Sequence, residues 1–371
     1  MLLTVLLGAP GMAQAQSAML EDAVGLASFV MFLESGATGM VLAVVHGDDQ
    51  MVVGYGETAK DSGKQPDGKS LLRLGSGSKV FAGELLGGLA AEGVVSLTDP
   101  LQRFAPEGIE VPNFDGRAIT LLDLATHAAA LPRDVPLDPP PNSPPFGWPT
   151  TADRFAWLTD FTLPWAPGSV AAYSNVGIDL LSDALATATG KSYAELLRER
   201  ITGPLGMSDT VVEPSEEQCA RFMTGYGIPG ADAAPCVSTA NIGGSGGLYS
   251  TADDMVLWLR HNLSRRDPAV WPTLALSHTA YLERGTLDAA IGFDEAGTMD
   301  AIALAWLVEE SADHRPMILQ KSGALAGFMT YTVFAPSHGV GVFVAVNKID
   351  FGMYAGLTEG AKELIASLAP Q

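Results

Sequence analysis

The residues Ser76-Gly-Ser-Lys79-Val-Phe-Ala-Gly-Glu-Leu-Leu-Gly-Gly-Leu-Ala-Ala-Glu92 place a serine three positions before a lysine at the start of an apolar helical run. Residues three apart lie on one face of a helix, so the Ser76 hydroxyl and the Lys79 amine can come within hydrogen-bond distance. Lys79 is the only lysine of the chain with a serine at this spacing. We therefore predict Ser76 as a nucleophile and Lys79 as its base, which requires the lysine pKa to fall from about 10.4 toward about 7.

A tyrosine and an asparagine stand two residues apart in Tyr173-Ser-Asn175, directly before a second helical run over residues 176–189. A phenol can relay a proton between a nucleophile and a leaving group, and an amide can hold a lysine or a substrate by hydrogen bonds. No other tyrosine of the chain has an asparagine at this spacing. We expect Tyr173 to act in proton transfer and Asn175 to orient its neighbours.

A third pattern, Lys321-Ser322-Gly323, stands at the end of a strand-like run. Lys321 and Ser322 offer a charge and a hydroxyl to a substrate carboxylate, and Gly323 would let the substrate backbone approach closely. The N–H just beyond, that of Ala324, would join the N–H of Ser76 in an oxyanion hole. These residues predict a carboxylate-binding strand beside the nucleophile.

The three patterns each occur once, in the order S-x-x-K, Y-x-N, K-[ST]-G. In this the chain resembles the serine β-lactamase and penicillin-binding-protein superfamily, and Y-x-N is typical of its class C branch. The segments Leu124-Ala-Thr-His127, Gly203-Pro-Leu-Gly-Met207 and Ile242-Gly-Gly-Ser-Gly-Gly247, with the cysteine pair, resemble the AmpH-type D-alanyl-D-alanine carboxypeptidase/endopeptidases. Two departures are the small Gly77-Ser78 pair and Ser322 in place of the usual threonine.

This resemblance implies an α/β (α+β) architecture, the β-lactamase/transpeptidase-like fold, with an antiparallel sheet flanked by helices and a helical domain beside it. It further implies a periplasmic enzyme that needs no cofactor, cleaves D-alanine-containing peptidoglycan stem peptides and is acylated by penicillins. The two departures make substrate preference the least determined property.

The order of helical and strand-like runs indicates one catalytic unit over residues 16–371. Residues 39–46 and 51–55 read as a hairpin, and residues 354–368 as a closing helix. The runs at 302–308, 317–321, 328–334 and 340–346 are strand-like. We expect sheet halves at about 20–75 and 300–371, separated by a mostly helical insert at about 76–299.

Two features of the insert have a local physical basis. Capping boxes are expected at Ser192-x-x-Glu195 and Thr251-x-x-Asp254. Residues 132–149 hold eight prolines, which predicts an extended surface loop, either a plain connection or a wall of the cleft.

The N-terminal run and the two cysteines point to export. Residues 1–15 read as a signal peptide that ends at Ala13-Gln-Ala15. In an oxidising compartment Cys219 and Cys236 would form a disulfide, and two unpaired thiols are the alternative. A periplasmic location follows.

Composition excludes several classes of function. The formal net charge of −21 and the pI near 4.5 disfavour nucleic acid and anionic lipid as partners. After the N-terminus no run reaches the roughly 18–20 apolar residues that span a bilayer, and the six histidines lack the spacing of a metal site. A peripheral membrane contact and the oligomeric state are left open.

Four alternatives compete with the DD-peptidase interpretation. A class C-like β-lactamase or a family VIII-like carboxylesterase would use the same Ser76. A penicillin-binding sensor would be acylated without turnover, but it should also carry a transmembrane segment. Finally, residues 243–247 fit G-x-S-x-G, which would make Ser245 the nucleophile of an α/β-hydrolase with Asp294 and His314 as partners.

Overall fold

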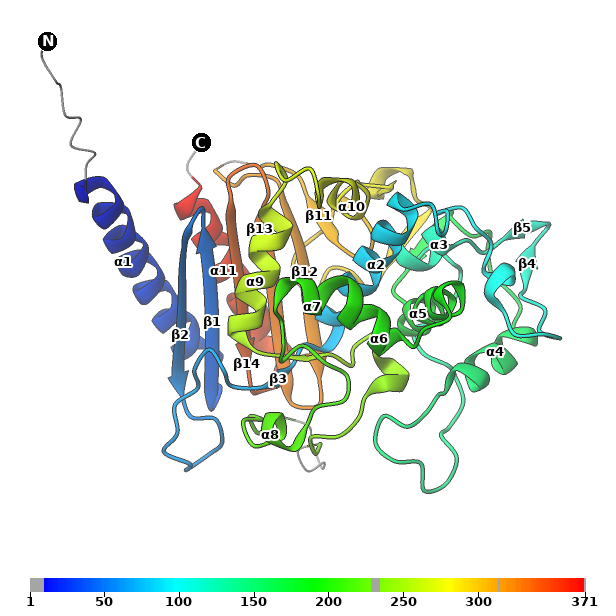
Figure 1. The fold of residues 1–371 in the computed structure, drawn as a ribbon, viewed down its shortest axis with the longest axis horizontal. Helices are drawn as coiled ribbons and strands as arrows, with labels where there is room; N and C mark the ends of the chain where they lie inside the picture. Colours follow the sequence, from blue (N-terminus) through cyan, green and yellow to red (C-terminus); the bar gives the residue numbers. More distant parts are fainter. Residues whose placement is uncertain (1–9, 228–233, 313, 370–371) are drawn as a thin grey trace, which may run out of the picture.

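Strands from both ends of the chain form one eight-stranded sheet in the computed structural model, which describes residues 10–227, 234–312 and 314–369. The sheet order is β2-β1-β14-β13-β12-β11-β10-β8, and all neighbours are antiparallel (Figure 1). Its strands are β1 (Gly39–His46), β2 (Asp49–Gly56), β8 (Leu282–Glu283), β10 (Ala301–Ile302), β11 (Leu307–Glu309), β12 (Ile318–Leu325), β13 (Phe328–Ala335) and β14 (Val340–Val346).

Strand β1 is buried on both faces because helices cover both sides of the sheet. On one side lie α1 (Pro10–Ser35) and α11 (Phe351–Leu368), which contact each other and the strands. On the other side α2 (Lys79–Ala91) and α9 (Ala252–Leu263) pack into the larger core. Leu42 and Val44 belong to the core layer under α1 and α11, whereas Ala43 and Val45 belong to the layer with α2 and α9.

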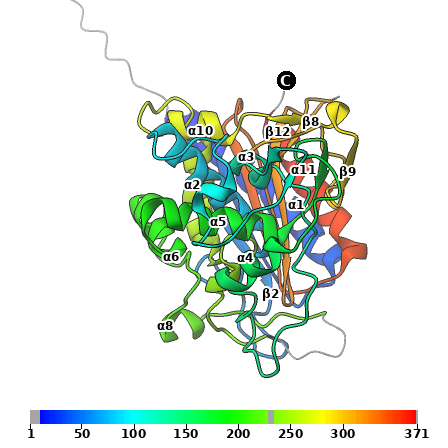
Figure 2. The same ribbon diagram turned by 90° about the vertical axis from the view of Figure 1, so that its right-hand side faces the viewer.

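The helical part of the chain lies beside this sheet, between β2 and β8 in sequence. Figure 1 places α3, α4 and α5 on the side of the molecule away from β1 and β2, and Figure 2 shows these helices toward the viewer. The helices here are α3 (Leu121–Ala125), α4 (Thr151–Thr159), α5 (Asn175–Thr189), α6 (Tyr193–Leu197), α7 (Gly203–Leu205), α8 (Glu216–Cys219) and α10 (Trp271–Ser277). Three two-stranded sheets accompany them: β3 (Leu72–Arg73) with β7 (Tyr249–Ser250), β4 (Asn113–Phe114) with β5 (Arg117–Ala118), and β6 (Val170–Ala172) with β9 (Ala289–Ile291).

The structure describes only the last part of the predicted signal peptide. Residues 1–9 of the predicted signal peptide lie outside the described residues, and α1 begins at Pro10. No helix in the described ranges is long and apolar enough to cross a membrane.

The apolar run at residues 302–308 is a tight hairpin and not one strand. Ala303 donates its N–H to the carbonyl of Trp306, and Ala305 has φ +62°. The whole turn is buried, with Trp306 fully inside the core. An apolar run shows that residues are buried, but it does not distinguish a buried turn from a strand.

The predicted capping box at Thr251 is only half formed. Thr251 accepts the N–H of Asp254 at 3.2 Å, as expected. The Asp254 carboxylate instead accepts the N–H of Asp209 at 2.9 Å and the hydroxyl of Thr210 at 2.8 Å. The box at Ser192 and Glu195 is complete.

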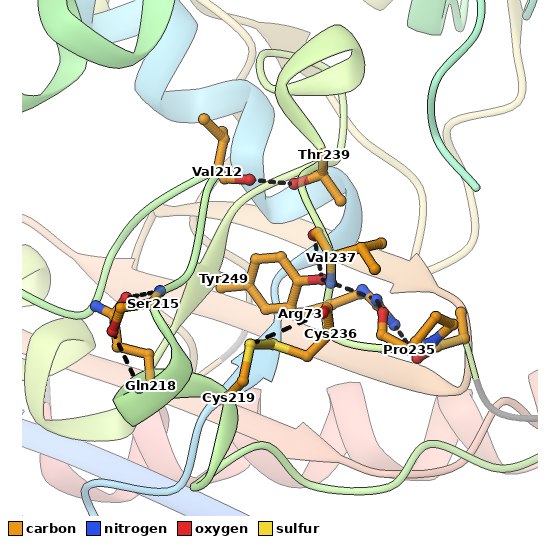
Figure 3. Close-up of a disulfide and its surroundings, with 11 residues drawn as sticks. Arg73, Val212, Ser215, Gln218, Cys219, Pro235, Cys236, Val237, Thr239 and Tyr249 are labelled. Carbon is orange, nitrogen blue, oxygen red and sulfur yellow. Dashed lines mark hydrogen bonds between the residues drawn. A yellow bond between two sulfur atoms is a disulfide. The ribbon is translucent and has the colours of Figure 1, made fainter. Parts of the chain in front are cut away.

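Cys219 and Cys236 form the predicted disulfide, with a Cα–Cα distance of 5.7 Å (Figure 3), so the alternative of two free thiols is wrong. Next to it, Arg73 donates to the carbonyl of Pro235 and, at 2.8 Å, to the hydroxyl of Tyr249. Arg73 lies in β3, three residues before Ser76. The disulfide-closed loop is therefore tied to the segment that leads to the predicted nucleophile.

Candidate active site

Ser76 lies in a 3-10 turn, Gly75–Ser78, that leads directly into α2. The turn is held from inside because Ser78 donates its hydroxyl to the Gly75 carbonyl at 2.8 Å and accepts the N–H of Leu248 at 3.0 Å. Gly75 has φ +54°, and a Cβ there would lie 2.7 Å from the backbone of Ala324. The turn Gly75–Ser78, which carries the predicted nucleophile, is thus packed against β12.

Gly323 has a different neighbour from the one that its motif suggested. We expected a glycine that opens space for a substrate backbone. A Cβ on Gly323 would instead lie 2.1 Å from the carbonyl oxygen of Leu74, 2.4 Å from the Thr330 hydroxyl and 2.9 Å from the N–H nitrogen of Gly77. Gly323 therefore allows β12 to touch the nucleophile turn.

We expect Gly323→Ala to lower the free energy of unfolding by about 1–3 kcal/mol, since the methyl group must displace backbone atoms. It should also slow acylation of Ser76, because the turn that carries this residue must shift. Urea unfolding and the acylation rate measure the two effects. Gly285→Ala is the matched control, because a Cβ at Gly285 meets nothing within 4 Å. Equal behaviour of the two variants would contradict this role.

Lys79 is the first residue of α2, and its side chain is 0% exposed. Its Nζ lies within hydrogen-bond distance of three oxygens: Ser76 Oγ at 3.2 Å, Asn175 Oδ1 at 2.7 Å and the carbonyl of Ser245. Burial, and then the charge of Lys321, hold the pKa of Lys79 well below its ordinary value. This environment favours the neutral amine, the form that can accept a proton from Ser76.

Tyr173 follows β6, and three basic side chains surround its ring. The distances from the ring centroid are 4.7 Å to Lys321 Nζ, 4.9 Å to Lys79 Nζ and 5.0 Å to the Arg133 guanidinium carbon. Burial raises the pKa of Tyr173 well above its ordinary value, and its hydrogen bond with Ser76 opposes that shift only in part. The phenol therefore keeps its proton at neutral pH.

His127 supports the tyrosine from behind, and no spacing in the sequence indicated it. Its ring stacks on Tyr173 at a centroid distance of 4.6 Å, and Phe293 meets the same tyrosine edge-on at 5.8 Å. The N–H of Ser174 donates to His127 Nδ1 at 3.1 Å. Burial, with the charges of Lys321 and Lys79, lowers the pKa of His127 well below its ordinary value, so this imidazole is neutral.

Asn175 is positioned from both sides of its amide. It begins α5, where Ser174 caps the helix by accepting the N–H of Gly177 at 2.9 Å. While Oδ1 of Asn175 accepts from Lys79, its Nδ2 donates to Asp134 Oδ1 at 2.8 Å. Asp134, a second residue that sequence patterns missed, thereby fixes which end of the amide faces the lysine.

Lys321 lies on β12, is 1% exposed and has no hydrogen-bond partner for its Nζ among the described residues. Burial lowers its pKa to about 8, against the opposing charge of Glu295. At neutral pH most of this lysine is charged. A buried cation of this kind favours an anionic ligand.

The edge of β12 is open next to Lys321. β11 pairs with β12 only as far as Gln320, while β13 pairs along the other side as far as Leu325. Leu325 pairs with Phe328 across a two-residue loop, and the residues that close such a loop form a hydrogen-bonded pair. The N–H of Ala324, one residue before this pair, therefore points away from β13. Ala324 and Ser76 line the same cavity of about 300 Å³.

The proline-rich loop at residues 132–149 has no regular structure and forms part of this cavity wall. Asp134, Val135, Trp148 and Pro149 line it. Of the two roles open at the level of sequence, the structure therefore favours the wall of the cleft.

Ser245 also lines the cavity, but it does not form the triad of an α/β-hydrolase. Its hydroxyl donates to Asp179 Oδ2 at 2.9 Å. Asp294 and His314 are engaged elsewhere, Asp294 with Arg284 and His314 with Glu363. The interpretation of residues 243–247 as a nucleophile elbow is wrong. In the described part of the chain, no three His, Cys, Asp or Glu side chains gather as a metal site would require.

Several known proteins are similar in sequence to this chain. The Beta-lactamase family model matches residues 14–364. The chain is 40% identical to the D-alanyl-D-alanine-carboxypeptidase/endopeptidase AmpH of Escherichia coli K12, over 91% of this chain and 87% of that protein. It is 28% identical to a beta-lactamase of the same organism, over 84% of each chain.

Solved structures show the same fold. The crystal structure of a Yersinia pestis beta-lactamase/D-alanine carboxypeptidase, complexed with citrate, superposes with a TM-score of 0.87 at 37% identity, over 96% of this chain and 99% of that one. A class C beta-lactamase superposes with a TM-score of 0.78 at 19% identity, over 96% and 98%. The expected β-lactamase/transpeptidase-like fold is confirmed.

Proposed function

The chain belongs to the beta-lactamase family, and on that premise we propose that it is a serine DD-peptidase that cleaves the D-alanyl-D-alanine ends of peptidoglycan stem peptides through an acyl-enzyme on Ser76. The observation that carries this proposal is that Ser76, Lys79, Tyr173 and Lys321 lie against one another, in a chain 40% identical to AmpH. Penicillins would acylate the same serine.

In acylation, the neutral Lys79 takes the proton of Ser76 as Oγ attacks the carbonyl carbon of the penultimate D-alanine. The oxyanion would be held by the N–H groups of Ser76 and Ala324, each worth about 3–4 kcal/mol. The C–N bond then breaks, Tyr173 protonates the departing amine, and the proton held by Lys79 passes to Tyr173. The net result is that the proton lost by Ser76 leaves on D-alanine. Water then adds to the ester: one of its protons returns to Ser76 Oγ, and the other is released as the shortened peptide departs as a carboxylate.

Lys321 and Ser322 would bind the terminal carboxylate of the substrate. The support is the burial of Lys321, its 4.7 Å distance from the Tyr173 ring and the lack of another partner for its Nζ in the described ranges. A carboxylate bound there would leave the scissile bond between Ser76 and Tyr173. A periplasmic location fits a substrate outside the cytoplasmic membrane and the disulfide of this chain.

The pKa of Lys321 predicts how substrate selectivity depends on pH. Below a pKa of about 8 the lysine is charged, and above it the lysine is neutral and loses its attraction for a carboxylate. We expect the ratio of kcat/KM for a D-Ala-D-Ala peptide to that for p-nitrophenyl acetate to fall as pH rises through about 8. The ratio cancels the shared dependence on Lys79. A ratio independent of pH would contradict carboxylate binding by Lys321.

The proposed function is tested by intact mass over time after mixing with excess benzylpenicillin, together with D-alanine release from a D-Ala-D-Ala peptide. We expect a covalent adduct lasting minutes to hours that Ser76→Ala does not form, and D-alanine release that penicillin inhibits. An adduct that disappears within seconds while penicillin is consumed would indicate a β-lactamase. No adduct, with ester hydrolysis intact, would indicate a carboxylesterase. A lasting adduct without D-alanine release would indicate a sensor.

A further inference from the structure

A buried carboxylate that belongs to none of the three motifs lies behind the reactive lysine. Asp179, one turn into α5, is 5% exposed. Its Oδ1 accepts the N–H of Ser245 at 3.0 Å, and its Oδ2 accepts the hydroxyl of Ser245 at 2.9 Å. Both oxygens of Asp179 thus hold a single residue, and that residue presents its carbonyl to Lys79.

The loop around Ser245 is tightly packed, which limits movement of the Ser245 peptide. A Cβ on Gly244 would lie 1.9 Å from the hydroxyl and 3.0 Å from the Cβ of Ser182 on α5, so the loop lies close against this helix. A Cβ on Gly247 would lie 2.6 Å from the carbonyl oxygen of Thr239. The peptide of Ser245 is therefore fixed by its own bonds and by its neighbours.

The number of donors on Lys79 explains why this carbonyl matters. A neutral amine has two N–H donors and one lone pair. The carbonyl of Ser245 and the Oδ1 of Asn175 are the two acceptors that can take both donors. The lone pair is then left facing the third neighbour, Ser76 Oγ, 3.2 Å away. If either acceptor moves, the amine can rotate away from the proton that it must remove.

We propose that Asp179 and Ser245 are positioning residues for Lys79: Asp179 fixes the peptide of Ser245, whose carbonyl orients the amine toward Ser76. The proposal rests on the proposed acylation of Ser76. Ser245 then acts through its carbonyl, which orients Lys79. Asp134 has a similar role for the other acceptor, because it accepts a hydrogen bond from Asn175 Nδ2.

Asp179 also acts on the lysine through its charge. Burial raises the pKa of Asp179 above its ordinary value, and the guanidinium of Arg154 opposes this shift. The ionised carboxylate raises the pKa of Lys79, against burial and Lys321, which lower it. Further titratable groups that interact with this pair are Arg133 and Asp134, which act on Lys79, and Tyr193 and Asp183, which lie near Asp179, Asp183 on the same helix. Removal of the charge should therefore lower the pKa of Lys79 further.

The test measures the pH profile of Ser76 acylation by benzylpenicillin in Asp179→Asn, Asp179→Ala and the wild type. The asparagine variant keeps the shape of the side chain, so we expect its acidic limb to move down by about half to one pH unit. The alanine variant also frees the Ser245 peptide, so we expect its maximal acylation rate to fall by about 10- to 100-fold. Thermal unfolding shows how much of each variant is folded.

Asp254→Asn and Asp254→Ala are the matched controls. Asp254, on α9, is also a buried carboxylate that accepts one backbone N–H and one hydroxyl, and burial raises its pKa as well. The two Asp254 variants should be less stable than the wild type but should keep its pH profile of acylation. An unmoved acidic limb in Asp179→Asn, with Asp179→Ala no slower than Asp254→Ala, would overturn the proposal.

A failure of the proposed function is distinguishable from a failure of this inference. If wild-type protein forms no penicillin adduct, the same profiles are measured with p-nitrophenyl acetate, which also acylates a reactive serine. A shifted limb and a slower alanine variant would then support the positioning pair although the DD-peptidase proposal had failed. No acylation of Ser76 by either reagent would overturn both.

Discussion

Replacement of Lys79 by alanine is expected to slow acylation of Ser76 by about a thousandfold or more, the largest effect that any single change short of removing the nucleophile should have. Lys79 is the only group that contacts Ser76 Oγ with a basic nitrogen in the described structure. Burial lowers the pKa of Lys79 and so favours its neutral form, which is the form needed by a base and not by a residue that only supplies positive charge. The acylation rate with benzylpenicillin measures the effect.

Lys79→Arg separates the two roles that a lysine could have. Arginine keeps a positive charge but does not lose its proton at accessible pH, so it cannot act as the base. We expect Lys79→Arg to be as slow as Lys79→Ala, while Lys64→Ala, at an exposed lysine, keeps the wild-type rate. An arginine variant with substantial activity would show that Lys79 stabilises charge and that another group removes the proton.

Lys321→Ala is expected to lower kcat/KM for D-Ala-D-Ala peptides and penicillins by about 100-fold, while kcat/KM for p-nitrophenyl acetate changes by about threefold or less. The reason is that only the first two substrates carry a carboxylate for the buried ammonium group to bind. The measurement is the ratio of the two losses in the same preparation, which is insensitive to the fraction of protein that is folded.

Two further variants frame this result. Lys321→Arg should recover part of the activity on carboxylate substrates because it restores the charge. Lys60→Ala, at an exposed lysine, should change kcat/KM neither for the carboxylate substrates nor for p-nitrophenyl acetate. Equal losses on the peptide and the neutral ester would refute the carboxylate-binding role of Lys321. They would point instead to its effect on the pKa of Lys79, since the charge of Lys321 lowers that pKa.

The local sequence predicted most of the elements that carry the site. Residues 79–92 and 176–189 have helical spacing, and α2 and α5 end within one residue of those predictions because Gly93 and Gly190 follow with positive φ. The long strands of the sheet were equally clear, since a run of buried β-branched and aromatic residues has few other conformations open to it. The hairpin at residues 302–308 was missed because a buried turn is as apolar as a strand.

The neighbours that tune the site could not be predicted in the same way. Asp134, His127 and Asp179 stand in the sequence without any spacing that links them to Ser76, and each acts only across the fold. The packing of Gly323 could not be predicted for the same reason, since two of the three atoms nearest to a Cβ there belong to Leu74 and Gly77, far earlier in the chain.

By itself the sequence determined the family and the fold, and it predicted the side chains to which we assign the chemistry, because helix spacing, strand patterning and motif order are local properties of the chain. Only the tertiary structure decided the state of those side chains. The pKa values of Lys79, Tyr173 and Lys321 depend on burial and on charges from α2, β6 and β12 together. The direction of the Lys79 amine depends on Asp179 and Ser245 from two further segments, because desolvation and orientation arise only where distant parts of the chain meet.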